Sequence, residues 1–286
     1  MELTSKSAIP LVIGTEVYSG AWGVPYAASD VATILNFALQ NGVNEIDTAA
    51  AYGERHFVEK LIGDAIAGAR KECIIATKFR HNLSGNQTGT PITTLIDIQR
   101  DLSDSLESLQ TDYIDIYYFH SGSDEEFFQD DIWKFLSEMK RQGVIRCLGL
   151  SLNHGLVQAE SYRQLEAAQD YGISIIQTVL NMYSRESLRV VIPFCKSHGL
   201  TLYGRMPLAK GLLSGKYSNS FVFPNSDPRS KDLKVTKDIL EFVGNEKEKV
   251  TAKRAMQWSL EYAEKIVLGV KNILQLKSAI NVCEGN

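Results

Sequence analysis

Four polar residues, each at or just after the end of a short β-type run, are suited together to acid–base chemistry: Asp47, Tyr52, Lys78 and His120. A phenol has a pKa near ~10 and is a poor acid at neutral pH, but a nearby ammonium group favours the phenolate and lowers that pKa. A carboxylate can hold the ammonium group in place, and an imidazole can donate a hydrogen bond to a bound carbonyl. Such a set suits protonation of a carbonyl oxygen while a hydride arrives at its carbon.

Eight β-type runs alternate with helical segments along the chain. The runs cover residues 11–15, 43–47, 73–78, 113–120, 144–151, 173–177, 200–204 and 266–269. The helical segments cover 31–39, 58–67, a helix that begins at Thr90-Pro91, 132–139, 155–170, 184–198 and 255–260. This alternation is typical of a parallel sheet with helical crossovers.

Eight such units in 286 residues fit a closed (β/α)8 barrel, the TIM barrel, as one domain over residues 1–286. A doubly wound sheet stays open as an alternative, although no Gly-x-Gly-x-x-Gly follows any run. In a barrel, functional residues lie at the carboxyl ends of strands. Five successive runs end at a polar residue, namely Asp47, Lys78, His120, Ser151 and Gln177. The shared position favours one common site.

Composition narrows the class of protein. The chain is 44% hydrophobic and 22% charged with a net charge of −4, which favours neither nucleic acid nor an anionic membrane surface as partner. Its four cysteines are dispersed without a C-x-x-C, so we expect reduced thiols in a cytoplasmic protein and no metal site. The first ten residues lack a signal-peptide pattern, and the apolar runs are too short to span a bilayer.

Residues 206–234 break the regular alternation, since they are rich in Ser, Asn, Pro and Gly. A loop of this length inside a compact unit is usually functional or disordered.

Over nearly its whole length the chain resembles the aldo-keto reductases. The resemblance is carried by Asp-Thr-Ala-x-x-Tyr-Gly at 47–53, Thr-Lys at 77–78, Tyr-x-Asp-x-x-x-x-His at 113–120 and Gly-Leu-Ser at 149–151, together with segments 207–217, 227–230 and 269–275. It implies Tyr52 as the general acid, Lys78 as the group that lowers the Tyr52 pKa, Asp47 as the partner of Lys78 and His120 as the residue that orients the substrate.

The resemblance also implies NADP(H) as cofactor and a small carbonyl compound as substrate. The nucleotide would lie extended, with its pyrophosphate under residues 206–216 and the 206–234 loop as its cover. The implied cofactor-binding residues are Thr15, Ser151, Gln177, Arg205, Pro207, Leu208, Gly211, Lys271, Asn272 and Gln275. Trp22 and His81 are candidates for the substrate pocket. The oligomeric state and the identity of the carbonyl compound stay open.

Three positions depart from the family pattern. Leu152 stands where an Asn usually follows the serine of the fifth strand, so that one carboxamide partner is absent or replaced by Asn153. The position aligned with the aromatic residue that stacks on the nicotinamide is Leu180. The adenine-contacting Asn aligns with Ala279, and Asn281 follows two positions later. These changes predict weak or atypical cofactor binding.

Two functions of different classes are therefore open. The first is an NADP(H)-dependent oxidoreductase that reduces a carbonyl group, which the four acid–base residues favour. The second is a nucleotide-sensing regulatory or scaffold protein on the same barrel, which the departures favour.

Overall fold

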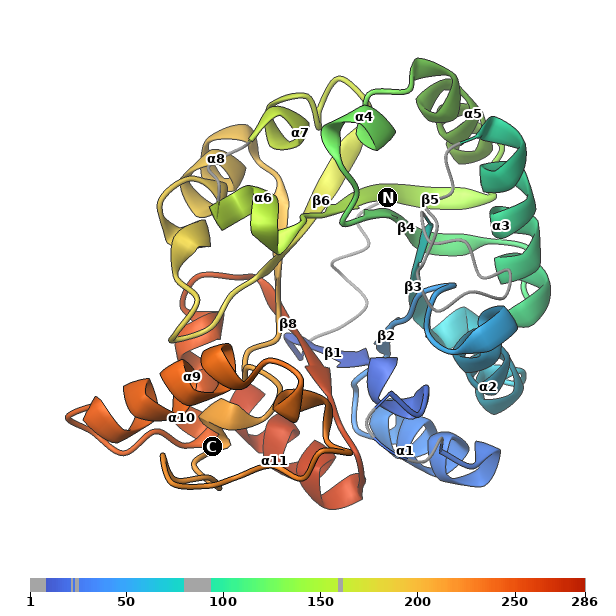
Figure 1. The fold of residues 1–286 in the computed structure, drawn as a ribbon. Coiled ribbons are helices and arrows are strands. Elements are labelled where there is room, and N and C mark those ends of the chain that lie inside the picture. Colours follow the sequence, from blue (N-terminus) through green and yellow to red (C-terminus); the bar gives the residue numbers. More distant parts are fainter. Residues whose placement is uncertain (1–8, 22, 24–25, 80–93, 159–161, 286) are drawn as a thin grey trace.

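Eight parallel strands close into a barrel in sequence order, with β1 paired to β8 (Figure 1). The computed structural model describes residues 9–21, 23, 26–79, 94–158 and 162–285. The strands are β1 (Leu11–Gly14), β2 (Glu45–Asp47), β3 (Ile74–Phe79), β4 (Ile114–His120), β5 (Ile145–Ser151), β6 (Ile173–Val179), β7 (Thr201–Arg205) and β8 (Lys265–Gly269). The predicted (β/α)8 barrel is confirmed, and the doubly wound alternative is wrong.

Helices surround the strands as crossovers (Figure 1). Those of the described residues are α1 (Ala28–Gln40), α2 (Phe57–Ile66), α3 (Leu95–Ser108), α4 (Asp124–Phe127), α5 (Asp130–Arg141), α6 (His154–Gln158), α7 (Arg163–Glu166), α8 (Val191–His198), α9 (Leu233–Asn245), α10 (Ala252–Leu260) and α11 (Ile273–Cys283). The predicted helix start at Thr90-Pro91 lies outside the described residues.

Two helical predictions need correction. The single helix expected over residues 155–170 is instead the short α6 and α7, and the helix expected over 184–198 is a 3-10 turn (Glu186–Leu188) followed by α8. In the second case Arg189 and the β-branched Val190 lie between the two pieces, and Pro193 stands in the first turn of α8, where a proline is tolerated.

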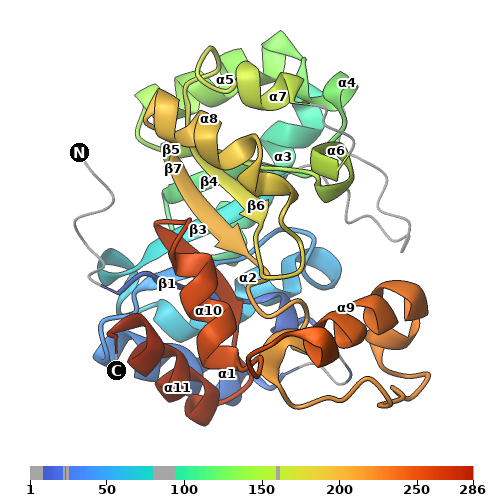
Figure 2. The same cartoon turned by 90° about the vertical axis from the view of Figure 1, so that its left-hand side faces the viewer.

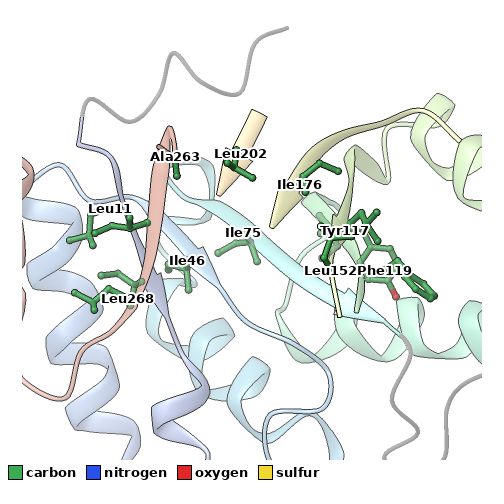
Figure 3. Close-up of a cluster of buried hydrophobic side chains, with 14 of the residues drawn as sticks. Leu11, Ile46, Ile75, Tyr117, Phe119, Leu152, Ile176, Leu202, Ala263 and Leu268 are labelled. Carbon is green, nitrogen blue, oxygen red and sulfur yellow. The ribbon is translucent and has the colours of Figure 1, made fainter. Parts of the chain in front are cut away.

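Strand side chains alternate between two separate apolar layers. Every second residue points outward to the helices, as Figure 3 shows for Leu11, Ile46 and Ile75. The intervening residues fill the barrel interior and include Val12, Ile74, Ile116, Tyr118, Tyr203 and Val267. Because both faces of each strand are buried, the strands read as continuous apolar runs.

Gly149 is required by the packing inside the barrel. A Cβ atom at this position would lie 2.4 Å from the Tyr118 ring, far closer than any van der Waals contact allows. The ring of Tyr118 is itself fully buried. The Gly-Leu-Ser segment on β5 therefore begins with glycine because a tyrosine from the neighbouring strand fills that space.

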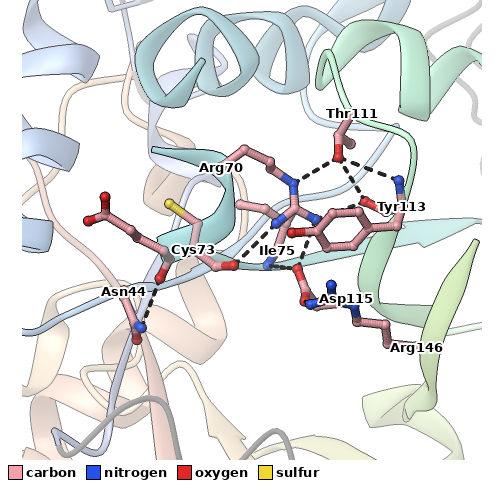
Figure 4. Close-up of polar contacts among 9 residues, drawn as sticks. Asn44, Arg70, Cys73, Ile75, Thr111, Tyr113, Asp115 and Arg146 are labelled. Atoms are coloured by element: carbon pink, nitrogen blue, oxygen red, sulfur yellow. Dashed lines mark hydrogen bonds and ion pairs between the residues drawn. The ribbon is translucent and has the colours of Figure 1, made fainter. Parts of the chain in front are cut away.

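The amino end of the barrel is held by a cluster of charged and aromatic groups (Figure 4). The Asp115 carboxylate accepts hydrogen bonds from Arg70 at 2.8 Å and from Arg146 at 2.7 Å. Both guanidinium groups stack on Tyr113, with their central carbons 3.9 and 3.8 Å from the ring centroid. The cluster joins the starts of β3, β4 and β5.

Residues 206–234 are a packed segment. Leu212 and Leu213 share a small apolar cluster with Ile239 and Leu240 of α9, a helix that the sequence reading missed. Arg229 lies over the Phe223 ring at 4.1 Å and is paired with Asp227 at 2.6 Å. Figure 2 shows this segment and α9 projecting beside the barrel.

Candidate active site

An ion pair at the carboxyl end of the barrel joins two of the four predicted acid–base residues. Lys78 Nζ donates to Asp47 Oδ1 at 2.5 Å and to the Thr48 carbonyl at 2.6 Å. Lys78 and Asp47 are 2% and 3% exposed, so both charges are withdrawn from bulk water. Neighbouring parallel strands place the two side chains at one edge, as the sequence predicted.

Tyr52 and His120 complete the group above this ion pair. Tyr52 follows β2 in a turn in which its amide donates to the Ala49 carbonyl at 3.0 Å. Lys78 Nζ lies 5.2 Å from the centroid of the Tyr52 ring. The His120 ring meets the Tyr52 ring edge-on, with centroids 6.2 Å apart. The four residues therefore lie together, and the Tyr52 ring is half-buried at the mouth.

The pKa of Tyr52 differs from the expectation. Burial raises the pKa of the phenol well above its ordinary value, and the negative charge of Asp47 adds to this shift. The positive charge of Arg205 acts in the opposite direction. The net lowering of the Tyr52 pKa that was expected from Lys78 is therefore not found. The phenol therefore keeps its proton at neutral pH.

A chain of hydrogen bonds fixes the groups beside Asp47. Gln177 Nε2 donates to Asp47 Oδ2 at 2.8 Å, and Ser151 Oγ donates to Gln177 Oε1 at 3.1 Å. Thr15 Oγ1 donates to the Asp47 carbonyl at 3.0 Å. Asp47 is thus the centre of a network that draws on β2, β3, β5 and β6 and on Thr15, just after β1.

A cavity of about 670 Å³ opens over this network. Most of the predicted cofactor-binding residues line it: Thr15, Gln177, Arg205, Pro207, Leu208, Gly211, Lys271 and Gln275. Ser151 and Asn272 are not among the lining residues, but each forms a hydrogen bond with a residue that is. Ser151 binds Gln177, and Asn272 caps α11 by accepting a hydrogen bond from the Gln275 amide at 2.9 Å.

Part of the cavity lining is cationic and was not predicted residue by residue. It includes Lys210, Lys216 and Arg229 in addition to Lys271. The start of α11 adds the partial positive charge of a helix N-terminus beside Lys271. The Asp-Pro-Arg-Ser segment at 227–230 was a sequence signal for Arg229. A cavity with acid–base groups in one part and cations in another suits an extended dinucleotide.

The prediction that Leu180 faces the nicotinamide is wrong. Leu180 is fully buried outside the barrel, where its Cβ and Cδ2 atoms lie 3.3 Å from the position of a Cβ on Gly204. The reason is strand alternation, which turns Gln177 and Val179 inward and Thr178 and Leu180 outward. The supposed loss of stacking at this position is therefore no argument for weak cofactor binding.

The other two departures also have structural answers. The Asn153 side chain donates to the Ser121 carbonyl and accepts from the Gly155 amide, both at 2.9 Å, so it joins the loops that follow β4 and β5. Ala279 does line the cavity, whereas Asn281 lies on the exposed face of α11 and does not replace it. Trp22 and His81 lie outside the described residues.

The described part of the chain offers neither a candidate membrane span nor a candidate metal site. None of its helices has the length and apolar character needed to cross a membrane. Nor do its His, Cys, Asp and Glu side chains form a group of three or more arranged to hold a metal ion.

Comparison with known proteins identifies the family of the chain. The profile of the Aldo/keto reductase family matches residues 10–286. The aldo-keto reductase YhdN of Bacillus subtilis is 32% identical over 239 residues, which span 82% of this chain and 69% of YhdN.

Two solved structures have the same fold. The holo form of aldo-keto reductase AKR11C1 from Bacillus halodurans is 24% identical with a TM-score of 0.79, over 97% of this chain and 87% of that one. Glycerol dehydrogenase AKR11B4 from Gluconobacter oxydans is 25% identical with a TM-score of 0.78, over 96% and 86%. The chain therefore belongs to the aldo-keto reductase family of oxidoreductases, which use nicotinamide cofactors.

Proposed function

We propose that this protein reduces an aldehyde, ketone or keto-sugar carbonyl to an alcohol with NADP(H), and that Tyr52 is the general acid. The observation that carries the proposal is the buried Lys78–Asp47 ion pair beneath the Tyr52 ring. A buried ion pair beside a protonated phenol at the mouth of a cavity is suited to proton transfer.

The reaction assigns one task to each side chain. A nicotinamide bound beside Tyr52 would supply the hydride to the carbonyl carbon. Tyr52 donates its proton to the carbonyl oxygen; its raised pKa keeps the phenol protonated at neutral pH but also makes it a weaker acid. As the phenol loses its proton, the nearby ammonium of Lys78 stabilises the developing negative charge. His120 holds the carbonyl oxygen next to the Tyr52 hydroxyl, and water then returns a proton to Tyr52.

The cationic part of the cavity would hold the phosphates of the cofactor. Lys271, with Gln275 beside it, is the proposed contact of the 2′-phosphate, which favours NADP(H) over NAD(H). Arg229 and Lys216 come from the 206–234 segment, which we propose covers the pyrophosphate. We further propose that the barrel acts as one functional unit, and that its four free cysteines suit a reducing compartment such as the cytoplasm.

A turnover experiment tests the function. NADPH consumption is followed with a panel of aldehydes, ketones and keto-sugars, with Tyr52→Phe as the control. Reduction that depends on Tyr52 is the expected result. A protein that binds NADPH but turns over no member of the panel would instead be a nucleotide sensor, the second function considered.

A further inference from the structure

A second group of buried polar side chains lies behind the site and has no part in the proposed chemistry. Its central members are His56, Glu59 and Asp101, which are 7%, 0% and 5% exposed. Burial of three ionisable groups is costly unless they bind one another. Their contacts therefore show what holds them there.

Glu59 binds three segments of the chain at once. Its carboxylate accepts a hydrogen bond from Thr77 Oγ1 at 2.6 Å and another from Ser105 Oγ at 3.2 Å. It also makes a very short contact with His56 Nδ1. Thr77 directly precedes Lys78 on β3, with its side chain on the opposite face of the strand. Glu59 is thus bound to the strand that presents the catalytic ammonium.

Asp101 extends the group to the next strand. Its carboxylate lies 4.0 Å from His56 Nε2 and accepts a hydrogen bond from the Tyr117 hydroxyl at 3.3 Å. Tyr117 lies three residues before His120 on β4. The helices that carry Glu59 and Asp101, α2 and α3, pack beside these strands (Figure 1).

His56 ends the turn that carries Tyr52. Its backbone is left-handed, with φ of 59°, and Gly53 in the same turn has φ of 80°. The Val58 amide closes the turn by donating to the Tyr52 carbonyl at 3.2 Å. A left-handed residue other than glycine is strained and persists only where its surroundings hold it. The contacts of the His56 imidazole with Glu59 and Asp101 supply that restraint.

We propose that His56 is a positioning residue for Tyr52: through Glu59 and Asp101 it fixes the 52–57 turn to the strands that carry Lys78 and His120. This inference rests on the proposed function, since it assigns His56 a role in aligning the general acid. His56 does not touch the reacting groups. It acts through the turn, and its loss should lower kcat while leaving nucleotide binding unchanged.

The charges of the network make this alignment depend on pH. Burial and the charge of Glu59 raise the pKa of Asp101 to about 8. Burial lowers the pKa of His56, but the hydrogen bond and charge of Glu59, together with Asp101 and Asp104, outweigh it and leave that pKa raised. Tyr117 of β4 faces the same group. Both folded-state pKa values lie above the unfolded ones, so protonation stabilises the network, and this stabilisation falls as pH rises to about 8.

The test compares His56→Gly and His56→Asn with Asp115→Asn. Glycine accepts the backbone conformation but removes the imidazole, whereas Asn accepts the conformation and keeps one hydrogen-bonding group. Asp115→Asn weakens the charged cluster at the amino end of the barrel, far from Tyr52, and controls for lost stability alone. All are measured at one temperature with NADPH and one reducible carbonyl compound, and kcat is expressed per folded molecule.

We expect His56→Gly to lower kcat at least about tenfold, because displacement of a catalytic group by 1 Å can cost about 10²-fold. NADPH Kd should stay within about twofold, and His56→Asn should recover part of the loss. We expect the wild-type kcat to fall as the pH rises toward about 8, and Asp101→Asn should remove that fall. A His56→Gly kcat within twofold of the Asp115→Asn value would overturn the inference.

A second readout separates this inference from the proposed function. Hydrogen exchange of the Val58 amide reports closure of the Tyr52 turn without any turnover. It should be faster in both His56 variants and unchanged in Asp115→Asn. If the wild-type protein reduces no carbonyl compound, the proposed function is wrong. Hydrogen exchange of the Val58 amide still tests whether His56 holds the Tyr52 turn. Unchanged Val58 exchange in both His56 variants would overturn that role alone.

Discussion

The two ends of the barrel interior each hold a buried lysine–carboxylate pair, and only one of them is part of a site. Asp47 and Glu45 lie two residues apart on β2 and point into the same interior. Asp47 pairs with Lys78 at the carboxyl end, and Glu45 pairs with Lys265 at the amino end. All four side chains are at least nine-tenths buried.

Their surroundings differ. The Asp47–Lys78 pair adjoins the cavity, Tyr52 and the amide of Gln177. The Glu45–Lys265 pair is enclosed by side chains of the barrel interior, with the ring centroid of Tyr203 5.7 Å from Lys265 Nζ. Burial raises the pKa of Glu45 even though Lys265 acts to lower it. A buried ion pair in this barrel is therefore suited to chemistry only where a cavity and a proton donor adjoin it.

The largest expected effect is a loss of activity from substitutions at the carboxyl end of the barrel. Tyr52→Phe should lower kcat by about 10²–10⁴-fold with little change in NADPH affinity, because it removes a positioned acid. Lys78→Met should act similarly, and the losses should not add in the double variant, since both residues serve one proton transfer. Steady-state kinetics with any active carbonyl compound measures this. Retention of more than about a tenth of the activity by Tyr52→Phe would be outside that range and would remove Tyr52 as the acid.

The next effect concerns stability at the amino end. Lys265→Met leaves the Glu45 carboxylate buried without its partner and should lower the free energy of unfolding by about 3–5 kcal/mol. The double variant Glu45→Leu/Lys265→Met should recover much of this loss, because no charge is then buried. Urea unfolding measures both. The kcat per folded molecule should stay near wild type, and a selective fall in kcat would make the amino-end pair part of the catalytic machinery.

A smaller loss of stability is expected from Gly149, which lies between the two ends of the barrel interior. Gly149→Ala places a Cβ atom 2.4 Å from the Tyr118 ring, which must then move within the closed interior. Overpacking of this kind costs about 1–3 kcal/mol. Thermal or urea unfolding should show the loss, and Tyr118→Leu in the same chain should relieve part of it. Wild-type stability in Gly149→Ala would mean that the ring does not fill this space.

The smallest expected effect is on nucleotide binding at the carboxyl end of the barrel. Lys271→Ala should weaken NADPH binding by about 1.5 kcal/mol, the lower end for a hydrogen bond to a charged group, because Lys271 is exposed. NADH binding should not change. Fluorescence titration of the two nucleotides gives both constants. Equal wild-type affinity for NADPH and NADH, or an unchanged preference in Lys271→Ala, would place the 2′-phosphate elsewhere.

The sequence by itself determined where the strands lie and at which of their ends the polar residues gather. Each predicted strand lies within two residues of the observed one, because apolar runs that end at a polar residue are a local signal. Asp47, Lys78 and His120 could be placed at one edge for that reason. The motifs around Tyr52 and Lys271 added the family, which the comparison then showed. A signal for α9 was also present, since Asp232 caps an amphipathic stretch in which Ile239 and Leu240 are buried, but it was missed.

Only the tertiary structure decided which side chains meet across the barrel. Gln177 reaches Asp47 over 130 residues of sequence, and closure of the sheet brings them together. The contacts of His56 with Glu59 and Asp101 join its turn to α2 and α3, and these two carboxylates in turn bind β3 and β4. The raised pKa of Tyr52 depends on burial as well as on nearby charges, and burial is a property of the folded chain.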